Sequence, residues 1–220
     1  MKKSIKYTLL LSICLAVFQA NSQTFGLKGG VNRSDVLYEN ATGNLSDATN
    51  MTMQGFHVGT TVENTLSEVL SLESELLVSL KGFKIDEHID GVVVRNKTNL
   101  YYLDIPVALK AKFDIGKSSK WYVAAGPVFD VGFAGNYVTV YDWHGSGQAE
   151  KEKITWGNGE GEIKRFDIGL TFGGGIEFGL WQVGVYYDLG LTDISPDANP
   201  ENTLKNRLWK ISVGYKLGSK

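Results

Sequence analysis

Apolar and polar side chains alternate along most of the chain with a period of two residues. This period is typical of β-strands with two different faces, whereas the spacing of amphipathic helices is almost absent. In residues 100–113, for example, Leu103 and Ile105 lie on one face and Asp104 and Lys110 on the other. The alternation predicts strands in eight segments, at residues 24–33, 53–63, 69–81, 100–113, 120–133, 165–179, 180–192 and 206–218.

The two faces of these predicted strands differ in charge. From residue 69 onwards the apolar face of each segment contains no charged side chain, and the opposite face carries the charges. Two folds produce this pattern. A soluble barrel turns its apolar face inward, whereas a membrane barrel turns it outward to lipid and keeps its polar face inside. Alternation alone therefore leaves both alternatives open.

Glycine on the polar faces favours the membrane barrel. Gly126, Gly132, Gly173 and Gly184 all interrupt polar rows. The interior of an eight-stranded barrel has just enough room for side chains, so small residues between charged ones suit an interior. On an exposed surface the same glycines would weaken the strands without a compensating gain.

Aromatic residues on the apolar faces gather near the ends of the segments. Membrane barrels carry two such belts, one at each headgroup level, because amphipathic rings favour that environment. One predicted belt consists of Phe25, Phe113, Trp121, Phe178, Trp181 and Tyr215. The other consists of Tyr101, Phe133, Phe166 and Trp209.

The connections between the segments alternate in length. Short connections are predicted at 64–68, at 114–119 and near Gly179, and long polar loops at 34–52, 82–99, 134–164 and 193–205. Short periplasmic turns and long extracellular loops are typical of outer-membrane barrels. We therefore predict an all-β fold, an eight-stranded antiparallel up-and-down transmembrane β-barrel with both termini on the periplasmic side.

The N-terminus has the pattern of a secretory signal peptide. Basic residues precede an apolar stretch from Tyr7 to Phe18, and the small residues Ala20 and Ser22 precede Gln23. The apolar stretch is too short for a stable transmembrane helix. We predict a cleaved signal peptide at 1–22 and a barrel domain at 23–220, in the outer membrane of a Gram-negative cell. A short membrane anchor is the alternative interpretation of residues 1–22.

Composition excludes several function classes. The chain has 220 residues and a net charge of −2, which argues against nucleic acid as a partner, and 43% hydrophobic residues argue against disorder. A single cysteine forms neither a disulfide framework nor a CxxC zinc site. His57, His88 and His144 lack metal-binding spacing, and no GxSxG motif marks a serine hydrolase. We predict no catalytic residues, no metal, no cofactor and no enzyme activity.

The charged residues of the polar faces are the candidate site. Inside a barrel these charges must pair, because an unpaired buried charge is strongly destabilising. We expect a structural ion-pair network, with a narrow ion path as the alternative, since eight strands leave too little room for a diffusion pore. The predicted lumen residues are Glu73, Glu75, Asp104, Lys110, Lys112, Asp130, Arg165, Asp167, Glu177, Asp188, Lys210 and Lys216.

Short motifs in a fixed order carry a family resemblance. FGLKGGVN begins at Phe25, YLDIPVALK at Tyr102 and VGYKL at Val213. With these motifs the chain resembles the outer-membrane β-barrel family common in Bacteroidetes, often called porin-family or PorT-like proteins. The resemblance covers essentially the whole predicted barrel and implies that Pro106 and Pro127 are tolerated within strands, at bulges. PorT-like relatives imply a role in protein secretion.

Two function classes follow from these observations. The first is a non-enzymatic integral outer-membrane barrel with a structural, surface-interaction or secretion-accessory role. Its partners are outer-membrane lipid and an unidentified protein or ligand at the extracellular loops. Tyr137, Tyr141, Trp143 and Trp156 in the third long loop are candidates for such contacts. The second class is a secreted lipocalin-like barrel that binds a small apolar ligand.

Overall fold

The computed structural model describes residues 23–40, 43–44, 52–89, 92–116, 118–143, 146–157, 159, 161–195 and 203–219. The predicted signal peptide at 1–22 lies outside the described residues. No helix among them is long and apolar enough to cross a membrane. The strands are β1 (Gln23–Asn40), β2 (Gly43–Asn44), β3 (Met53–Thr65), β4 (Leu70–Ile89), β5 (Val92–Asp114), β6 (Ser119–Trp143), β7 (Ser146–Lys153), β8 (Phe166–Phe178), β9 (Trp181–Gly190) and β10 (Thr203–Ser219).

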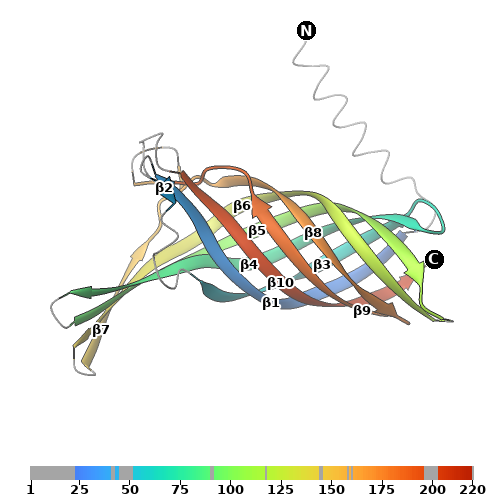
Figure 1. Ribbon diagram of the computed structural model, residues 1–220, viewed down its shortest axis with the longest axis horizontal. Helices are drawn as coiled ribbons and strands as arrows, with labels where there is room; N and C mark the ends of the chain where they lie inside the picture. The colour runs from blue at the N-terminus through green and yellow to red at the C-terminus, as the bar shows by residue number, and fades with distance from the viewer. Residues whose placement is uncertain are drawn as a thin grey trace, which may run out of the picture.

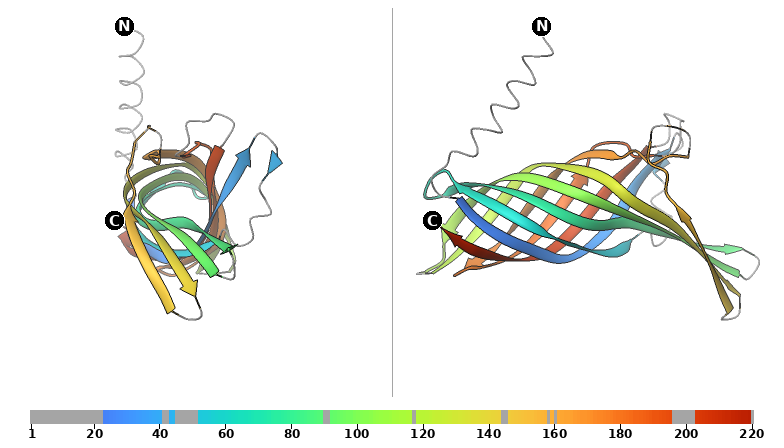
Figure 2. Two further views of the ribbon diagram at one scale, coloured as in Figure 1. Left: turned by 90° about the vertical axis from the view of Figure 1, so that its left-hand side faces the viewer. Right: turned by 180° about the vertical axis from the view of Figure 1, so that it is seen from behind.

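Eight of these strands form a closed antiparallel ring (Figures 1 and 2). The strand order is β10-β9-β8-β6-β5-β4-β3-β1, and a ladder between β10 and β1 closes the ring. The two short strands β2 and β7 pair with β1 and β6 outside the ring. Closure gives every ring strand a hydrogen-bonded neighbour on both sides, as a membrane-spanning sheet requires. The predicted eight-stranded up-and-down barrel is confirmed.

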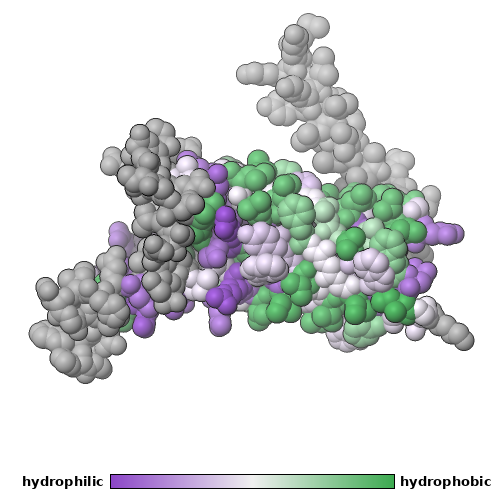
Figure 3. Space-filling model, viewed as in Figure 1, coloured by the Kyte–Doolittle hydropathy of each residue, from purple (hydrophilic) through white to green (hydrophobic). Residues whose placement is uncertain are grey.

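The apolar faces of the strands point outward, and the polar faces point into the lumen. Val31 and Phe166 on the outer surface are 60% and 67% exposed, whereas the lumen residues Asp104 and Lys110 are 0% exposed. Figure 3 shows the resulting hydrophobic surface on the side in view, with hydrophilic residues toward both ends. A lipocalin-like barrel requires the opposite arrangement, so that alternative is excluded.

Aromatic rings pair across neighbouring strands near both borders of this hydrophobic surface. At one border Phe113 stacks on Trp121, with ring centroids 4.4 Å apart. At the other border Tyr187 packs against Trp209, with centroids 4.9 Å apart. These pairs support the two predicted belts, because rings at these positions lie at the level of the lipid headgroups.

The short connections lie together at one end of the barrel, which we call the turn end. They cover residues 66–69, 115–118 and 179–180, and positive φ angles of 87° at Gly116 and 58° at Gly179 allow two of these turns. The paired ends of β1 and β10 lie there too, since Thr24 pairs with Ser219. The predicted short turns are therefore confirmed.

Two of the predicted long loops are largely wrong. Within 82–99, β4 continues to Ile89 and β5 begins at Val92, and within 134–164, β6 continues to Trp143 and pairs with β7. The extensions of β4, β5 and β6 project together with β7 from the other end of the barrel, the loop end (Figure 1). Both faces of a projecting strand meet water, so the apolar–polar contrast disappears there although the backbone ladder continues.

The predicted bulges at the prolines are also wrong. Pro106 pairs with Val128 of β6 and Pro127 with Leu170 of β8, both in regular register. The register shifts occur elsewhere, at Phe25/Gly26 and at Tyr101/Tyr102. The register is unchanged past each proline, but the neighbouring pairs are interrupted, between Ser74/Val107 and Leu77/Asp104 on the β4 side and between Pro106/Val128 and Leu109/Ala125 on the β6 side.

Candidate functional site

The lumen is filled by side chains in three successive layers. We name them, from the turn end to the loop end, the turn-end network, the aspartate layer and the apolar plug. The first two are built by the period-two alternation of the ring strands, which points every second residue inward, and the plug adds side chains from segments outside those strands. A fourth feature, outside the ring, is a sheet formed by the projecting strands.

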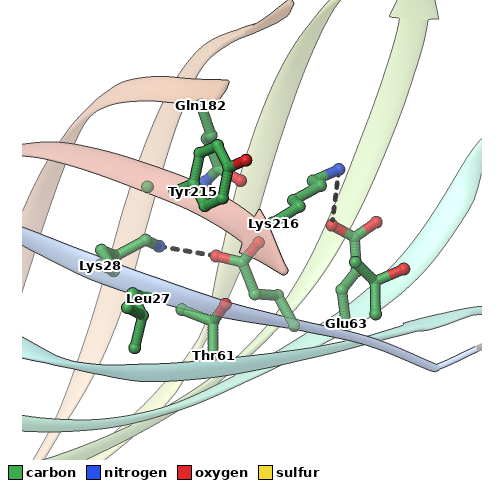
Figure 4. Close-up of a pocket in the computed structure, with 10 residues that line it drawn as sticks. Leu27, Lys28, Thr61, Glu63, Gln182, Tyr215 and Lys216 are labelled. Atoms are coloured by element: carbon green, nitrogen blue, oxygen red, sulfur yellow. Dashed lines mark hydrogen bonds and ion pairs between the residues drawn. The ribbon is translucent and has the colours of Figure 1, made fainter. Parts of the chain in front are cut away.

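The turn-end network pairs lysines with glutamates around Lys110. The Lys110 ammonium is fully buried and lies 2.6 Å from Glu177, 2.8 Å from Glu73 and 3.4 Å from Glu63. Figure 4 shows three of its side chains, Lys28, Glu63 and Lys216, which reach into the lumen from β1, β3 and β10. The members are Lys28, Lys110, Lys112, Lys216, Glu63, Glu73, Glu75 and Glu177.

Contacts within this network are redundant. Glu63 and Glu177 each form ion pairs with the three lysines Lys110, Lys112 and Lys216. A cavity lined by network residues has a volume of about 10 Å³, roughly the space of one water molecule. The turn end of the lumen is therefore occupied by paired charges rather than by an open channel.

Two buried tyrosines complete this end of the lumen. The hydroxyl groups of Tyr122 and Tyr186 lie 2.8 Å apart, and the Gln182 amide donates a hydrogen bond of 3.0 Å to each. A Cβ atom at Gly173 would lie 2.2 Å from the Tyr186 ring, and one at Gly184 would lie 2.3 Å from the Tyr122 hydroxyl. The glycines in the polar rows thus leave room for the two rings.

The aspartate layer contains three carboxylates side by side on adjacent strands. Asp104 of β5 is in register with Asp130 of β6, which is in register with Asp167 of β8. The Lys81 ammonium lies 3.0 Å from Asp104 and 2.6 Å from Asp130. Asp167 accepts a hydrogen bond of 2.8 Å from the Asn206 amide. Neighbouring like charges repel, so the three carboxylates need compensating donors such as Lys81 and Asn206.

A fourth aspartate completes the layer. Asp188 of β9 forms an ion pair of 2.6 Å with Lys210, so four aspartates face two lysines. Among the described residues, no group of metal-binding side chains is arranged to hold a metal ion. Each aspartate keeps one buried carboxylate oxygen without a hydrogen bond or ion pair: Asp104 Oδ2, Asp130 Oδ1, Asp167 Oδ1 and Asp188 Oδ1.

His57 lies beside the aspartate layer and is fully hydrogen-bonded. Its Nδ1 lies 2.6 Å from the Asn32 side-chain oxygen, and its Nε2 lies 2.8 Å from the Ser212 hydroxyl. The other two histidines have no described side chain. His57 therefore acts as a structural residue of the lumen wall.

The apolar plug closes the loop end of the lumen. Buried side chains of the segments after β7 and β9 fold inward onto the ring strands, and Trp156 packs edge-on against Tyr102 with ring centroids 5.6 Å apart. A Cβ atom at Gly132 would lie 2.2 Å from the Trp156 ring, so glycine is required there. The buried plug residues are Val36, Leu100, Tyr102, Ile154, Ile163, Ile194 and Leu204.

Asp193 fastens the plug segment that carries Ile194. Its carboxylate accepts hydrogen bonds from the backbone N–H groups of Ser195, at 3.0 Å, and Leu204, at 2.9 Å. Lys164 donates a further bond of 2.7 Å. Partial burial acts to raise the pKa of Asp193, but these three donors together outweigh it and hold the pKa below its usual range.

The projecting parts of β4, β5, β6 and β7 form one sheet, which we call the protruding sheet (Figure 2). β7 pairs only with β6, so its other edge is free of strand partners among the described residues. Tyr141 on this sheet is 41% exposed, whereas Trp156 belongs to the plug. The side chain of Trp143 lies outside the described residues.

The comparison with protein families decides what kind of barrel this is. The model for the outer membrane protein beta-barrel domain matches residues 19–195, which is most of the chain. The chain belongs to this outer-membrane β-barrel family. Its turn end accordingly faces the periplasm, and the protruding sheet lies outside the cell. No curated protein matches the chain.

Solved structures of outer-membrane proteins are similar to this family member at low identity. OprG from Pseudomonas aeruginosa is 14% identical with a TM-score of 0.47, over 90% of this chain and 96% of that one. Neisserial surface protein A is 14% identical with a TM-score of 0.40, over 88% and 97%. Ail of Yersinia pestis, solved with the heparin analogue sucrose octasulfate, is 14% identical with a TM-score of 0.39, over 89% and 98%.

The structure places the predicted lumen residues of this outer-membrane barrel in two groups. Glu73, Glu75, Lys110, Lys112, Glu177 and Lys216 lie in the turn-end network. Asp104, Asp130, Asp167, Asp188 and Lys210 lie in the aspartate layer. Arg165 was predicted to lie in the lumen, and this prediction is wrong. It is exposed at a bend just before β8, where the alternation of the strand has not begun.

Three ionic lumen residues were missed from the sequence. Lys28 and Glu63 lie on the first two strand segments, whose faces the charge contrast did not assign. Lys81 lies eight residues after Glu73 on β4, and in a strand residues an even number apart point to the same face. This spacing could have identified Lys81 as a lumen residue.

Proposed function

We propose that this barrel is a non-enzymatic surface protein that recognises an extracellular partner through its protruding sheet. The observation that carries the proposal is the contrast between the two parts of the molecule. The lumen is filled by ion pairs and closed by the apolar plug, while an ordered sheet projects beyond the membrane. A filled lumen serves stability, which leaves the outer surface for recognition.

The free edge of β7 is suited to an extended segment of a partner protein. An unpaired edge strand offers main-chain hydrogen bonds, and side chains on its faces select among partners. The sequence Glu150-Lys151-Glu152-Lys153 places acidic residues on one face and basic residues on the other. Such alternating charges discourage non-specific edge pairing and favour a partner of complementary pattern.

Deletion of the sheet tip tests the proposal. A variant that lacks residues 140–149 removes the tip of β6 and the start of β7 but leaves the ring intact. Whole cells that display either form are treated with an amine-reactive cross-linker, and captured proteins are identified by mass spectrometry. We expect partners that the intact protein captures and the deletion variant does not. A K151E/E152K variant, which keeps the strand but breaks its alternating charge pattern, should lose the same partners, because that pattern selects them.

The opposite outcome is equally informative. If both forms capture the same proteins, recognition does not depend on the protruding sheet, and a purely structural role in the membrane is favoured. A heat-dependent band shift in SDS gels checks that each variant still forms a barrel. The comparison is valid only for variants that pass this check.

We also propose that residues 1–22 are removed on export and that the chain belongs to the PorT-like branch found in Bacteroidetes. The signal-peptide pattern and the order of the three motifs support these assignments. N-terminal sequencing of the membrane form is expected to begin at Gln23. A secretion role predicts that a deletion strain loses secreted proteins from its culture medium, whereas an unchanged set of secreted proteins would argue against it.

A further inference from the structure

The outer surface of the barrel contains a hollow within its apolar band. It lies across β1, β3, β9 and β10 and has a volume of about 400 Å³. Its floor and walls are apolar and are formed mainly by Val31, Val185, Trp209 and Ile211. This volume is within the range of specific small-molecule sites, which is about 300–1,000 Å³.

The register places the hollow at the extracellular border of the membrane. Val31 is opposite Ile211 across the β1–β10 ladder, and Arg33, two residues further along, is opposite Trp209. Trp209 belongs to the extracellular aromatic belt, where it packs against Tyr187. The hollow therefore runs from the hydrocarbon region up to the headgroup level, and Arg33 stands at its upper end.

Basic side chains surround this upper end. On the same outward row of β10, Arg207 and Lys205 follow Trp209 toward the loop end, and the acidic residue opposite Arg207 is Asp35. Arg33 is exposed and donates a weak hydrogen bond of 3.5 Å to Thr52. The Nε of Arg207 has no hydrogen-bond partner. Among the described side chains of these two rows, three basic groups against one acidic group give this border a positive charge.

We infer that the hollow binds a membrane lipid of the outer leaflet, with one acyl chain against Val31, Val185 and Ile211 and an anionic phosphate headgroup against Arg33 and Arg207. The apolar walls match hydrocarbon, and a guanidinium group matches phosphate in charge and in hydrogen-bond geometry. Both halves of the site lie on one outward surface, at the two depths that the two halves of a lipid occupy. A water-soluble ligand would not meet the apolar half of this site.

Lipid binding to the purified full-length barrel tests the inference. Native mass spectrometry in detergent counts bound dioleoyl phosphatidylglycerol and bound dioleoyl phosphatidylcholine, which differ in headgroup charge but share their acyl chains. We expect one phosphatidylglycerol to remain bound at concentrations where phosphatidylcholine dissociates. The R33Q and R207Q substitutions should each weaken this binding about fivefold, which is the usual contribution of one basic residue near an anionic lipid surface.

Charge controls separate this site from general attraction. R165Q removes an exposed arginine that lies beside β8, away from the hollow, and should leave the binding unchanged. R33K keeps the charge and should recover most of the loss seen with R33Q. Equal losses for R165Q and R33Q, or equal retention of the two lipids by the unmodified protein, would overturn the inference.

The apolar half has its own pair of variants. V185W places a large ring in the hollow, whereas V183W makes the same change on β9 outside it. Both positions are outward-facing and exposed, so both variants should keep the heat-dependent band shift. We expect at least a tenfold loss of phosphatidylglycerol binding for V185W and none for V183W. Equal binding by both variants, or displacement of the lipid by glycerol phosphate without acyl chains, would show that no acyl site exists.

Discussion

The two charged layers of the lumen are built by the same alternation but differ in how their charges are compensated. The turn-end network has four lysines for four glutamates, and its carboxylates share cations. The aspartate layer has two lysines for four aspartates, and among the described residues only Lys81 pairs with more than one of them. One layer is redundant, and the other is not.

This difference follows from side-chain length and position. Glutamate and lysine side chains from several strands are long enough to meet near the barrel axis, so one ammonium reaches three carboxylates. Aspartate side chains are shorter and remain near their own strands, where Asp104, Asp130 and Asp167 stand next to each other in register. The same inward placement of alternate residues therefore produces shared ion pairs at one level of the lumen and a row of adjacent carboxylates at the other.

Removing Lys81 should have the largest effect of any single change in the lumen. K81M leaves Asp104 and Asp130 without their cation, and an uncompensated buried charge typically costs about 3–5 kcal/mol. We expect a loss of this size in the free energy of unfolding, measured by urea titration of the protein in lipid vesicles. Tryptophan fluorescence and the band shift give two independent signals.

The triple variant K81M/D104N/D130N is the matched control for this prediction. It removes the two carboxylates together with the lysine, so most of the lost stability should return. If K81M and the triple variant are equally unstable, the effect of Lys81 comes from packing of its side chain rather than from charge.

Lys110 should be less important than Lys81, although it is equally buried and touches more carboxylates. After K110M, Glu63 and Glu177 still have Lys112 and Lys216, and Glu73 still has Lys28. We expect a loss of about 1–3 kcal/mol in the same urea titration, as for a hydrogen-bonded group that loses one partner. A loss larger than that of K81M would contradict the claim that the network is redundant.

Most of the fold was predictable from the sequence because membrane and lumen impose opposite demands on alternate residues. The parity of Trp209 and Lys210, for example, places one in lipid and the other among charges. The strand extensions beyond Ile85 and Gly135 were not predictable in this way, since water on both faces removes the contrast. The extensions are strands because they pair with each other, and the pattern of residues within one segment does not reveal its partner.

The candidate site was predictable only as a set of inward residues. Parity identifies Lys110 and Asp104 as lumen residues, but their partners depend on the stagger between strands. The plug is a further example: Ile163 and Ile194 lie in segments of irregular backbone, and no period marks them as buried. Arg165 shows the reverse case, because alternation was extended by one residue past the true start of β8.

Asp193, which accepts three hydrogen bonds, can be compared with the carboxylates of the aspartate layer. Its pKa is lowered in the folded protein, so its stabilising effect is complete above its usual pKa and is lost as the pH falls through the folded value. D193N should therefore cost about 1 kcal/mol at neutral pH, measured by urea titration. The difference from the unmodified protein should vanish in acid. A difference that stays constant with pH would assign the effect to geometry rather than to charge.

D130N should have the smallest effect, and that makes it the sharpest test of the comparison. Asp130 occupies the middle of the aspartate row, with Asp104 and Asp167 as cross-strand neighbours. Asparagine keeps the size of the side chain and an oxygen for Lys81, while it removes one of the charges that repel each other. We expect a change within about 0.5 kcal/mol of zero in the urea titration, the size typical of substitutions that remove no needed interaction.

The matched substitution at the other level is E73Q, which removes a carboxylate from a network whose charges are balanced. Glu73 pairs with both Lys28, at 2.7 Å, and Lys110, at 2.8 Å, so its replacement leaves cations in excess and should cost about 1–3 kcal/mol. If E73Q loses more free energy of unfolding than D130N, the turn-end network has balanced charges and the aspartate layer has an excess of negative charge. If D130N costs as much as E73Q, the aspartate layer is as well compensated as the turn-end network, and the unpaired oxygens do not represent repulsion.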